Sequence, residues 1–281
     1  MAGPPVVLVT GGDGQVGRAL RPLLPTARYA PRDELDVTDR ARASDAIAGV
    51  DVVVHLAAMT DVDRCEREPR LAEEVNGAGS RNVAAAARAA GARVIGVSTD
   101  YVFDGTTPGE YTEADRPRPL SVYGRTKLAG EVALLEAGDN TVIRTSWVYC
   151  DGRNFIRTIL RAAAAGRPLV VVDDQVGRPT AAADVARAIV HLLSIDSPRL
   201  VHVTGDGPPT SWAGVAEQSL AAAGLTVPVE RVSTMEYGRR MNSALAQRPA
   251  NSLLSLDRAR GLGLPLSDWR TSVSAYARGA A

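Results

Sequence analysis

The sequence is poor in the residues that build disulfide-rich, zinc-binding or membrane-spanning proteins. It has two cysteines, Cys65 and Cys150, which lie far apart without a CxxC motif or a Cys/His cluster. This spacing argues against a disulfide framework and a zinc site. No apolar run approaches the ~18 residues of a membrane span, and the first residues lack the pattern of a signal peptide. We therefore expect a cytoplasmic protein without a metal site or a membrane partner.

The sequence also lacks an excess of either charge. Lys plus Arg and Asp plus Glu both number 32, so the formal net charge is zero. Proteins that bind a nucleic-acid backbone usually carry a basic surplus. We expect a small-molecule substrate and no nucleic-acid partner.

The chain contains a regular alternation of strand and helix patterns. Short apolar runs are typical of buried strands, and longer segments place apolar residues at helical spacing. The predicted strands are residues 6–9, 51–56, 93–97 and 141–144. The predicted helices are residues 15–24, 71–90, 122–137 and 154–165. Because strands that alternate with helices form parallel sheets, the predicted fold class is α/β, with a doubly wound, Rossmann-like sheet.

The alternation of predicted strands and helices becomes less regular after about residue 150, where turns rich in Pro and Gly appear. We assign residues 1–146 to an NAD(P)-binding domain, which the chain rejoins at about residues 180–195. Residues 147–179 and 196–281 are assigned to a smaller substrate-binding lobe. A chain of 281 residues suits this pair of units, and no further module is expected.

A glycine-rich loop, TGGDGQVG at residues 10–17, joins the first predicted strand to the first predicted helix. Gly11 and Gly14 let the backbone turn tightly beside a pyrophosphate, and Gly17 permits close packing of the helix. Gln15 and Val16 begin this helix, whose N-terminus supplies N–H donors. An ordinary tight turn is the alternative, but the position after the first strand favours a cofactor loop.

The segment about twenty residues further on bears on the choice of cofactor. Arg32 suits the 2'-phosphate of NADPH, whereas Asp33 or Glu34 suits the free 2'-hydroxyl of NADH. A solvated turn explains any one of them equally well. We predict NADPH, with NADH as the alternative.

Tyr123 and Lys127 lie four residues apart on a predicted helix and so share one face. We expect the ammonium group to lower the pKa of Tyr123 from ~10 toward neutrality, which makes the tyrosine a better proton shuttle. By itself such a pair is often only an exposed helical contact. Thr99 lies at the carboxyl end of the strand at residues 93–97, where doubly wound sheets bind ligands, and its hydroxyl can orient a carbonyl. Thr99, Tyr123 and Lys127 are therefore the predicted catalytic residues.

Together these residues resemble the extended short-chain dehydrogenase/reductase superfamily, with its TGxxGxxG loop and its Ser/Thr, Tyr and Lys. Within that superfamily the sequence is most similar to the dTDP-4-dehydrorhamnose reductase family. The matching segments are LVTGGDGQVGRAL (8–20), LDVTD (35–39), AAMTDVDRCE (57–66), VSTDYVFDG (97–105), YGRTKLAGE (123–131), RTSWVY (144–149), VVDDQVGRPT (171–180) and RPANSLL (248–254). The STDYVFDG and DDQxGxPT segments are specific to this family.

The resemblance implies reduction of the C4 keto group of a dTDP-4-keto-6-deoxy sugar, giving dTDP-L-rhamnose. It places Asp36 and Val37 beside the adenine, and Ala57 and Ala58 on the nicotinamide side. The residues assigned to the substrate are Asp100, Tyr101 and Trp147 near the sugar, with Arg178 and Arg248 as candidate partners of the diphosphate. Core packing is the alternative role for Tyr101 and Trp147.

Two segments differ from the family pattern, namely HLAAM at residues 55–59 and Cys150-Asp151. They leave open whether the sugar is rhamnose or another deoxysugar of natural-product biosynthesis. His55 is expected to pack or to hydrogen-bond and not to catalyse.

Two other classes of function remain as alternatives. One is a non-catalytic regulatory subunit, which would not need all three catalytic residues, and the other is an epimerase or dehydratase. The oligomeric state, a homodimer included, and a metal ion that bridges subunits are also left open.

Overall fold

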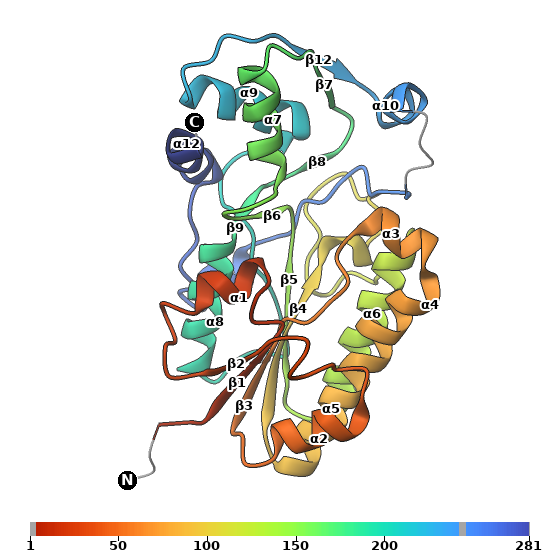
Figure 1. Ribbon diagram of the computed structural model, residues 1–281, viewed down its shortest axis with the longest axis vertical. Helices are drawn as coiled ribbons and strands as arrows, with labels where there is room; N and C mark the ends of the chain where they lie inside the picture. The colour runs from red at the N-terminus through yellow and green to blue at the C-terminus, as the bar shows by residue number, and fades with distance from the viewer. Residues whose placement is uncertain (1–3, 242–245, 281) are drawn as a thin grey trace.

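A parallel sheet of six strands forms the centre of the computed structural model, which describes residues 4–241 and 246–280. The strand order is β10-β5-β4-β3-β1-β2, and every neighbouring pair is parallel (Figure 1). The strands are β1 Val7–Thr10, β2 Arg28–Ala30, β3 Val52–His55, β4 Arg93–Thr99, β5 Thr141–Thr145 and β10 Leu200–His202. This sheet confirms the predicted α/β fold class.

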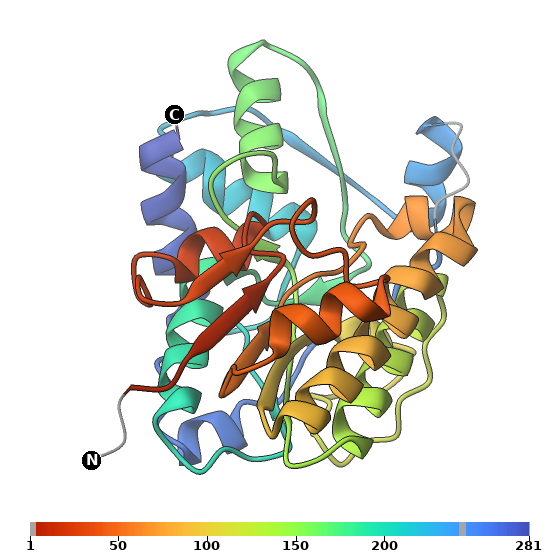
Figure 2. The same ribbon diagram turned by 60° about the horizontal axis from the view of Figure 1, so that its bottom comes forward.

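Helices cover both faces of the sheet, as the two views in Figures 1 and 2 show. On one face α1 (Gln15–Leu20) packs against α8 (Ala182–Leu193), and on the other α5 (Gly79–Ala90) packs between α2 (Arg40–Ile47) and α6 (Val122–Glu136). Val7 and Val9 of β1 enter the core on the first face, and Leu8 enters the core on the second. Because both faces are covered, these strands read in the sequence as continuous apolar runs.

A smaller lobe lies beyond the sheet, at the top of Figure 1. Its core combines α7 (Phe155–Ala164), α9 (Trp212–Ala222) and α12 (Trp269–Ala280) with the parallel pair β7 (Leu169–Val172) and β12 (Val229–Val232). The remaining elements are β6 Val148–Tyr149, β8 Val176–Gly177, β9 Thr180–Ala181, β11 Thr210–Ser211, α3 Val62–Arg67, α4 Pro69–Ala72, the π-helix η1 Glu73–Ala78, the 3₁₀-helix η2 Asp100–Val102, α10 Thr234–Met241 and α11 Asp257–Gly261. Within the described residues, no helix combines the length and apolar character needed to cross a membrane.

The structure differs from the predicted division of the chain after residue 196. β10 pairs with β5 at the edge of the large sheet, and α11 packs against β10. Both elements fall in the segment assigned to the smaller lobe. With three and five residues, they are too short to show a diagnostic apolar period.

The predicted helix at residues 71–90 is also not one regular helix. It begins earlier, with Pro69 in the first turn of α4, and passes through η1 before α5. The predicted helix at residues 15–24 ends at Leu20, and turns that lead to Pro25 follow it.

The chain order reverses at β1, which has β2 on one side and β3 on the other. The connections that follow β1 and β3 therefore leave the sheet in different directions. In open parallel sheets, ligands bind at such a switch point, beyond the carboxyl ends of the strands.

Candidate active site

A cleft of about 750 Å³ opens at the carboxyl ends of the central strands and is closed on one side by the smaller lobe. Most of the residues predicted for the cofactor, for catalysis and for the sugar line this single cleft. They are Gly11, Gly14, Gln15, Val16, Gly17, Arg32, Asp36, Val37, Ala57, Ala58, Thr99, Asp100, Tyr101, Tyr123, Lys127 and Trp147. The fold thus brings together residues that are far apart in the sequence.

The glycine loop between β1 and α1 forms one end of the cleft. Gly11 has a φ of 65°, and the Gly14 N–H donates a hydrogen bond of 3.0 Å to the Gly11 carbonyl oxygen. A Cβ atom on Gly11 would lie 2.6 Å from the backbone nitrogen of Ala57, and one on Gly17 would lie 2.6 Å from the carbonyl carbon of Gly12. Glycine is therefore required at both positions, and the backbone of this loop stays open to a ligand.

Several polar atoms that line the cleft are buried without a partner in the described structure. They are Gln15 Oε1 beside the glycine loop, Ser98 Oγ at the end of β4 and Thr145 Oγ1 at the end of β5. Buried polar atoms usually have a hydrogen-bond partner. Together with the open glycine loop, these atoms fit a polar ligand such as a dinucleotide.

Arg32 also lines the cleft. Its side chain is exposed, and its Nη2 lies 3.8 Å from Asp36 Oδ2. The Asp36 carboxylate is held by Thr38, whose N–H and hydroxyl both donate to Oδ1. Glu34 pairs instead with Arg28, at 3.7 Å. An exposed guanidinium is thus present at the predicted position of the adenosine ribose.

Tyr123 and Lys127 are both buried in the first half of α6, close to the ends of β4 and β5. Ser121 is the N-cap of α6, and its hydroxyl accepts a hydrogen bond of 3.1 Å from the Gly124 N–H. The Lys127 Nζ donates to the Val97 carbonyl oxygen at 2.8 Å, and the Tyr123 ring lies edge-on to Tyr101 with 5.5 Å between centroids. The tyrosine and the lysine therefore face the cleft from one side of the helix.

The pKa of Tyr123 differs from the expectation. We expected Lys127 to lower it, but burial of the phenol raises the pKa well above its usual value, and the Thr99 hydroxyl offsets this only in part. The reason is that the charged phenolate loses its hydration in this pocket. Burial also lowers the pKa of Lys127 to about 8, against the opposite effect of Glu131. Near neutral pH, Tyr123 is therefore a neutral phenol, which is the form that donates a proton.

Thr99 interacts both with the Tyr123 phenol and with a buried carboxyl group, that of Asp100. Its hydroxyl donates to Asp100 Oδ1 at 3.0 Å and accepts a hydrogen bond of 3.2 Å from the Tyr101 N–H. Burial raises the pKa of Asp100 to about 6, although hydrogen bonds from Ser252 and Thr99 act in the opposite direction. The cleft thus contains a carboxyl group that titrates close to neutrality.

Asn76, on the π-helix η1, is a further buried residue that ties two walls of the site together. Its Oδ1 accepts from the Met59 N–H at 2.8 Å, and its Nδ2 donates to the Met59 carbonyl oxygen and to Thr126 Oγ1, both at 3.1 Å. Met59 belongs to the loop after β3, and Thr126 precedes Lys127 on α6. Sequence reasoning missed Asn76, because a single Asn in a helical pattern carries no signal of this role.

His55 is also buried, and it serves as a hydrogen-bonding residue, which confirms the expectation for it. Its Nδ1 lies 2.8 Å from Thr10 Oγ1, and its Nε2 lies 3.0 Å from Ser80 Oγ. Burial, and then the charge of Lys127, lower the pKa of His55 to about 3. The imidazole is therefore neutral and joins β1 to α5 through β3.

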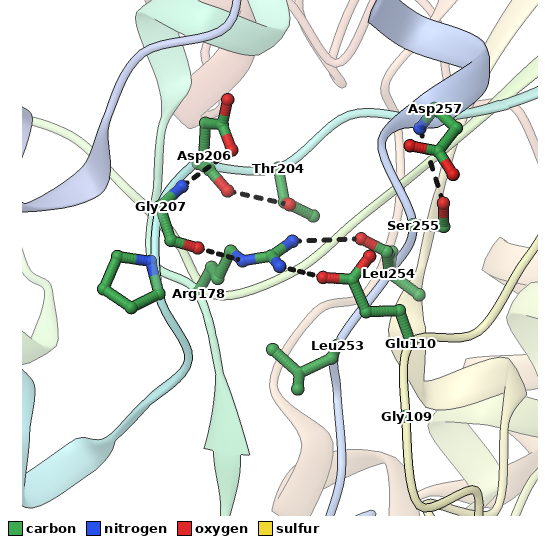
Figure 3. A network of polar contacts seen from close by, with 12 residues as sticks. Gly109, Glu110, Arg178, Thr204, Asp206, Gly207, Leu253, Leu254, Ser255 and Asp257 are labelled. Carbon is green, nitrogen blue, oxygen red and sulfur yellow. Dashed lines mark hydrogen bonds and ion pairs between the residues drawn. The ribbon is translucent and has the colours of Figure 1, made fainter.

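The two arginines predicted to bind a diphosphate are not among the residues that line the cleft. Figure 3 shows the Arg178 guanidinium among Gly207, Leu254 and Glu110. It donates to the carbonyl oxygens of Gly207 at 2.8 Å and Leu254 at 3.2 Å, and it pairs with the Glu110 carboxylate. All three nitrogen atoms of the Arg178 guanidinium therefore have protein partners, and they link the loops that contain Glu110, Gly207 and Leu254.

Arg248 lies nearer to the cleft than Arg178. Its Nη2 donates to Asp63 Oδ2 at 2.8 Å, and its Nη1 donates to the carbonyl oxygen of Ala246 at 3.1 Å. Burial acts to lower the pKa of Arg248, but the hydrogen bond to Asp63 and the interactions with Tyr101 raise it on balance. The arginine thus contacts a cleft residue while it is paired with a carboxylate.

The cleft residues that were not predicted as site residues include Thr145, Ser146 and Trp212. Thr145 and Ser146 precede Trp147 in the RTSWVY segment, so their place beside a predicted residue was a usable signal. Trp212 begins α9 in the smaller lobe and carries no motif. Its ring stacks on Trp147 with 3.9 Å between centroids. Only the packing of the lobe against the sheet places it in the cleft.

Comparison with known proteins agrees with this architecture over nearly the whole chain. Residues 6–280 match the model of a family described as the RmlD substrate binding domain. A dTDP-4-dehydrorhamnose reductase of Sinorhizobium fredii is 39% identical and covers 94% of this chain and 94% of its own length. A dTDP-4-keto-6-deoxy-D-glucose reductase of Streptomyces niveus is 36% identical and covers 95% of this chain and 94% of its own length.

Solved structures show the same similarity. The crystal structure of a dTDP-4-dehydrorhamnose reductase from Clostridium acetobutylicum has a TM-score of 0.89 and 34% identity, covering 96% of this chain and 97% of its own. The Bacillus anthracis dTDP-4-dehydrorhamnose reductase, solved in complex with NADP, has a TM-score of 0.89 and 32% identity, covering 98% of each chain. On this evidence the chain belongs to the dTDP-4-dehydrorhamnose reductase family, within the extended short-chain dehydrogenase/reductase superfamily.

Proposed function

We propose that the protein reduces the C4 keto group of dTDP-4-dehydrorhamnose with NADPH and forms dTDP-L-rhamnose. The observation that carries this proposal is the convergence of Thr99, Tyr123 and Lys127 with the glycine loop in one cleft. A proton donor, a cation and an open pyrophosphate loop are the parts that a nicotinamide-dependent ketone reduction needs.

The cofactor is proposed to lie along the first half of the cleft. Gly11, Gly14 and Gly17, with Gln15 and Val16, would hold its pyrophosphate, and Asp36 and Val37 would lie beside its adenine. Ala57 and Ala58 would contact the nicotinamide side. The exposed Arg32 favours NADPH over NADH, because a guanidinium pairs well with a 2'-phosphate. Bound NADPH would supply the hydride for C4 of the sugar.

The protein's part in the reaction is proton donation and orientation. Tyr123, which is neutral near pH 7 because it is buried, donates its phenolic proton to the C4 oxygen. The Thr99 hydroxyl orients that oxygen, and the Lys127 ammonium holds the nicotinamide ribose and stabilises the phenolate that remains. This role requires no lowered tyrosine pKa before the reaction, because the donor is the protonated form.

The substrate is proposed to enter from the side of the smaller lobe. Asp100, Tyr101 and Trp147 would contact the sugar, and Arg248 is the better placed of the two arginines for the diphosphate, because it lies beside Tyr101. For Arg178 to take that role, its contacts with Glu110 and two carbonyl groups would have to break.

One experiment tests substrate and cofactor together. The protein is incubated with dTDP-4-keto-6-deoxy-L-mannose or with dTDP-4-keto-6-deoxy-D-glucose, each with NADPH or NADH. Oxidation of the cofactor is followed by absorbance, and the product is identified by NMR. We expect dTDP-L-rhamnose from the first sugar, with a lower KM for NADPH than for NADH.

Other results would support the alternatives. Turnover of the D-glucose derivative alone would favour the activity for which the Streptomyces niveus relative is named. Product formed without net consumption of the cofactor would indicate an epimerase or dehydratase. Cofactor binding without oxidation in the presence of either sugar would indicate a regulatory subunit and would overturn the proposal.

A further inference from the structure

Two tryptophans from different parts of the chain form one wall of the cleft. The rings of Trp147 and Trp212 stack with 3.9 Å between centroids and 14° between planes, and Phe155 packs edge-on against Trp212 at 4.8 Å. Both indoles line the cleft. Trp147 follows β5 of the large sheet, whereas Trp212 begins α9 of the smaller lobe, so the wall exists only when the two units are packed together.

The backbone of Trp147 is held in a conformation that large residues rarely adopt. Its φ is 48°, the one positive value found for a non-glycine residue in 4–241 and 246–280. A left-handed conformation of a bulky residue persists only where its surroundings enforce it, and such residues cluster at functional sites. The Thr180 N–H donates to the Trp147 carbonyl oxygen at 3.2 Å, and the contacts of the ring add to this constraint.

Two residues of the VVDDQVGRPT segment, Gly177 and Gln175, contact the stacked tryptophans Trp147 and Trp212. A Cβ atom on Gly177 would lie 2.8 Å from Cε2 and Cζ2 of the Trp147 indole, so only glycine leaves room for the ring. Gln175 accepts a hydrogen bond of 3.2 Å from Trp212 Nε1 and donates one of 2.8 Å to Thr234 Oγ1. Gly177 and Gln175 thus fix the positions of the two rings, and neither is among the residues that line the cleft.

We propose that Trp212 is a positioning residue that holds Trp147 as the wall of the sugar pocket and so sets the KM for the sugar nucleotide. This inference rests on the proposed function, because it concerns the same cleft. With Trp212 stacked on one face and Gly177 packed against the other, the Trp147 indole presents its edge to the cleft. A rigid aromatic surface suits the apolar side of a 6-deoxy sugar, whose C6 carries a methyl group.

The test compares three variants by the KM for the dTDP-4-keto sugar, the KM for NADPH and kcat. Trp212→Ala removes the stack, Trp212→Phe keeps an aromatic ring, and Trp269→Phe is the matched control. Trp269 is also a buried tryptophan of the smaller lobe, with its Nε1 bonded to the Pro208 carbonyl oxygen, but it does not line the cleft.

We expect Trp212→Ala to raise the KM for the sugar about 10-fold, with the KM for NADPH changed less than about 2-fold. Trp212→Phe should recover most of the loss, and Trp269→Phe should keep the wild-type value for the sugar. If Trp212→Ala leaves the KM for the sugar unchanged, or raises both KM values together, Trp212 does not position the sugar wall.

Gly177→Ala provides a second test that leaves both tryptophans in place and applies if Trp212→Ala does not fold. The new methyl group must displace the Trp147 ring, so we expect the same selective rise in the KM for the sugar. A wild-type KM for this variant would overturn the inference. Failure of the proposed function is distinguished by the wild-type protein, which would then turn over neither sugar.

Discussion

At the scale of single residues, burial determines which protonation states the cleft offers. The same loss of hydration that keeps Tyr123 a neutral phenol lowers the pKa of Lys127 to about 8 and raises that of Asp100 to about 6. The i,i+4 spacing placed Tyr123 and Lys127 on one helix face, but spacing alone does not report how deeply a side chain is buried. The direction of the tyrosine shift was therefore not predictable from the i,i+4 pattern.

The raised pKa of Asp100 makes the stability of the protein depend on pH. The folded state holds this proton more tightly than the unfolded chain, whose carboxyl group titrates near 3.8. The resulting stability is fully present below that value and is lost as pH rises through about 6. Relative to wild type, Asp100→Asn should therefore gain about 2 kcal/mol of unfolding free energy between about pH 4 and pH 7.

Urea unfolding of wild type and Asp100→Asn across this range measures the difference directly. Other carboxyl groups cancel, because they are common to both proteins. A difference that does not change with pH would show that folding does not raise the pKa of Asp100.

At the scale of elements, the π-helix η1 is bonded to α6, the helix that carries Tyr123 and Lys127. Asn76 bonds Met59 in the loop after β3 and Thr126 on α6, so it sets the distance between two walls of the site. We expect Asn76→Ala to lower kcat about 10- to 100-fold, because small displacements of catalytic groups are costly. Steady-state kinetics below the unfolding temperature measure this effect.

Asn140 provides a matched control for Asn76. It is also buried, and it bonds the Val94 N–H at 2.6 Å and the Leu134 carbonyl oxygen at 2.7 Å, away from the cleft. Both Ala variants should lose about 1–3 kcal/mol of stability, since each leaves backbone groups unpaired. Equal kcat values for the two variants would contradict a positioning role for η1.

The four predicted strands were recognisable because both faces of the sheet are covered, which makes each one an apolar run. β2 and β10 were missed, because each has three residues and lies at an edge of the sheet. The π-helical turn was missed for another reason. The residues from 71 to 90 have good local helix propensity, and the altered hydrogen bonding at Glu73–Ala78 accompanies the tertiary contacts of Asn76.

At the scale of the whole molecule, Arg178 joins loops of the two units. Figure 3 shows it where the chain segments around Glu110, Gly207 and Leu254 meet. Arg178→Met leaves a carboxylate and two carbonyl groups without this donor, so we expect a loss of about 3 kcal/mol of unfolding free energy. Arg231→Met is the control, because its ion pairs with Glu217 and Asp173 are exposed and should contribute at most about 1 kcal/mol each.

Two measurements on both variants, chemical unfolding and the KM for the sugar nucleotide, decide between two roles for Arg178. A stable Arg178→Met protein with a raised KM for the sugar nucleotide would restore the original prediction of a diphosphate contact. A destabilised protein with an unchanged KM would establish Arg178 as a residue that ties the loops together.

The site was predictable where it follows strands of the large sheet, and less so where the smaller lobe contributes. Thr99, Tyr123, Lys127 and the glycine loop lie at strand ends or helix starts, which sequence patterns locate. Trp212 and the buried environment of Arg178 depend on how the smaller lobe packs. No local pattern encodes that arrangement.

The central claim is that Tyr123 donates the proton to the C4 oxygen of the sugar. Single-turnover reduction of dTDP-4-keto-6-deoxy-L-mannose by NADPH tests it most directly, with wild type, Tyr123→Phe and the control Tyr276→Phe, whose hydroxyl bonds the Cys150 carbonyl oxygen outside the cleft. We expect Tyr123→Phe to bind NADPH as wild type does but to lose at least about 100-fold in the rate of reduction, as removal of a general acid does. Reduction by Tyr123→Phe at a rate close to that of Tyr276→Phe would contradict the account.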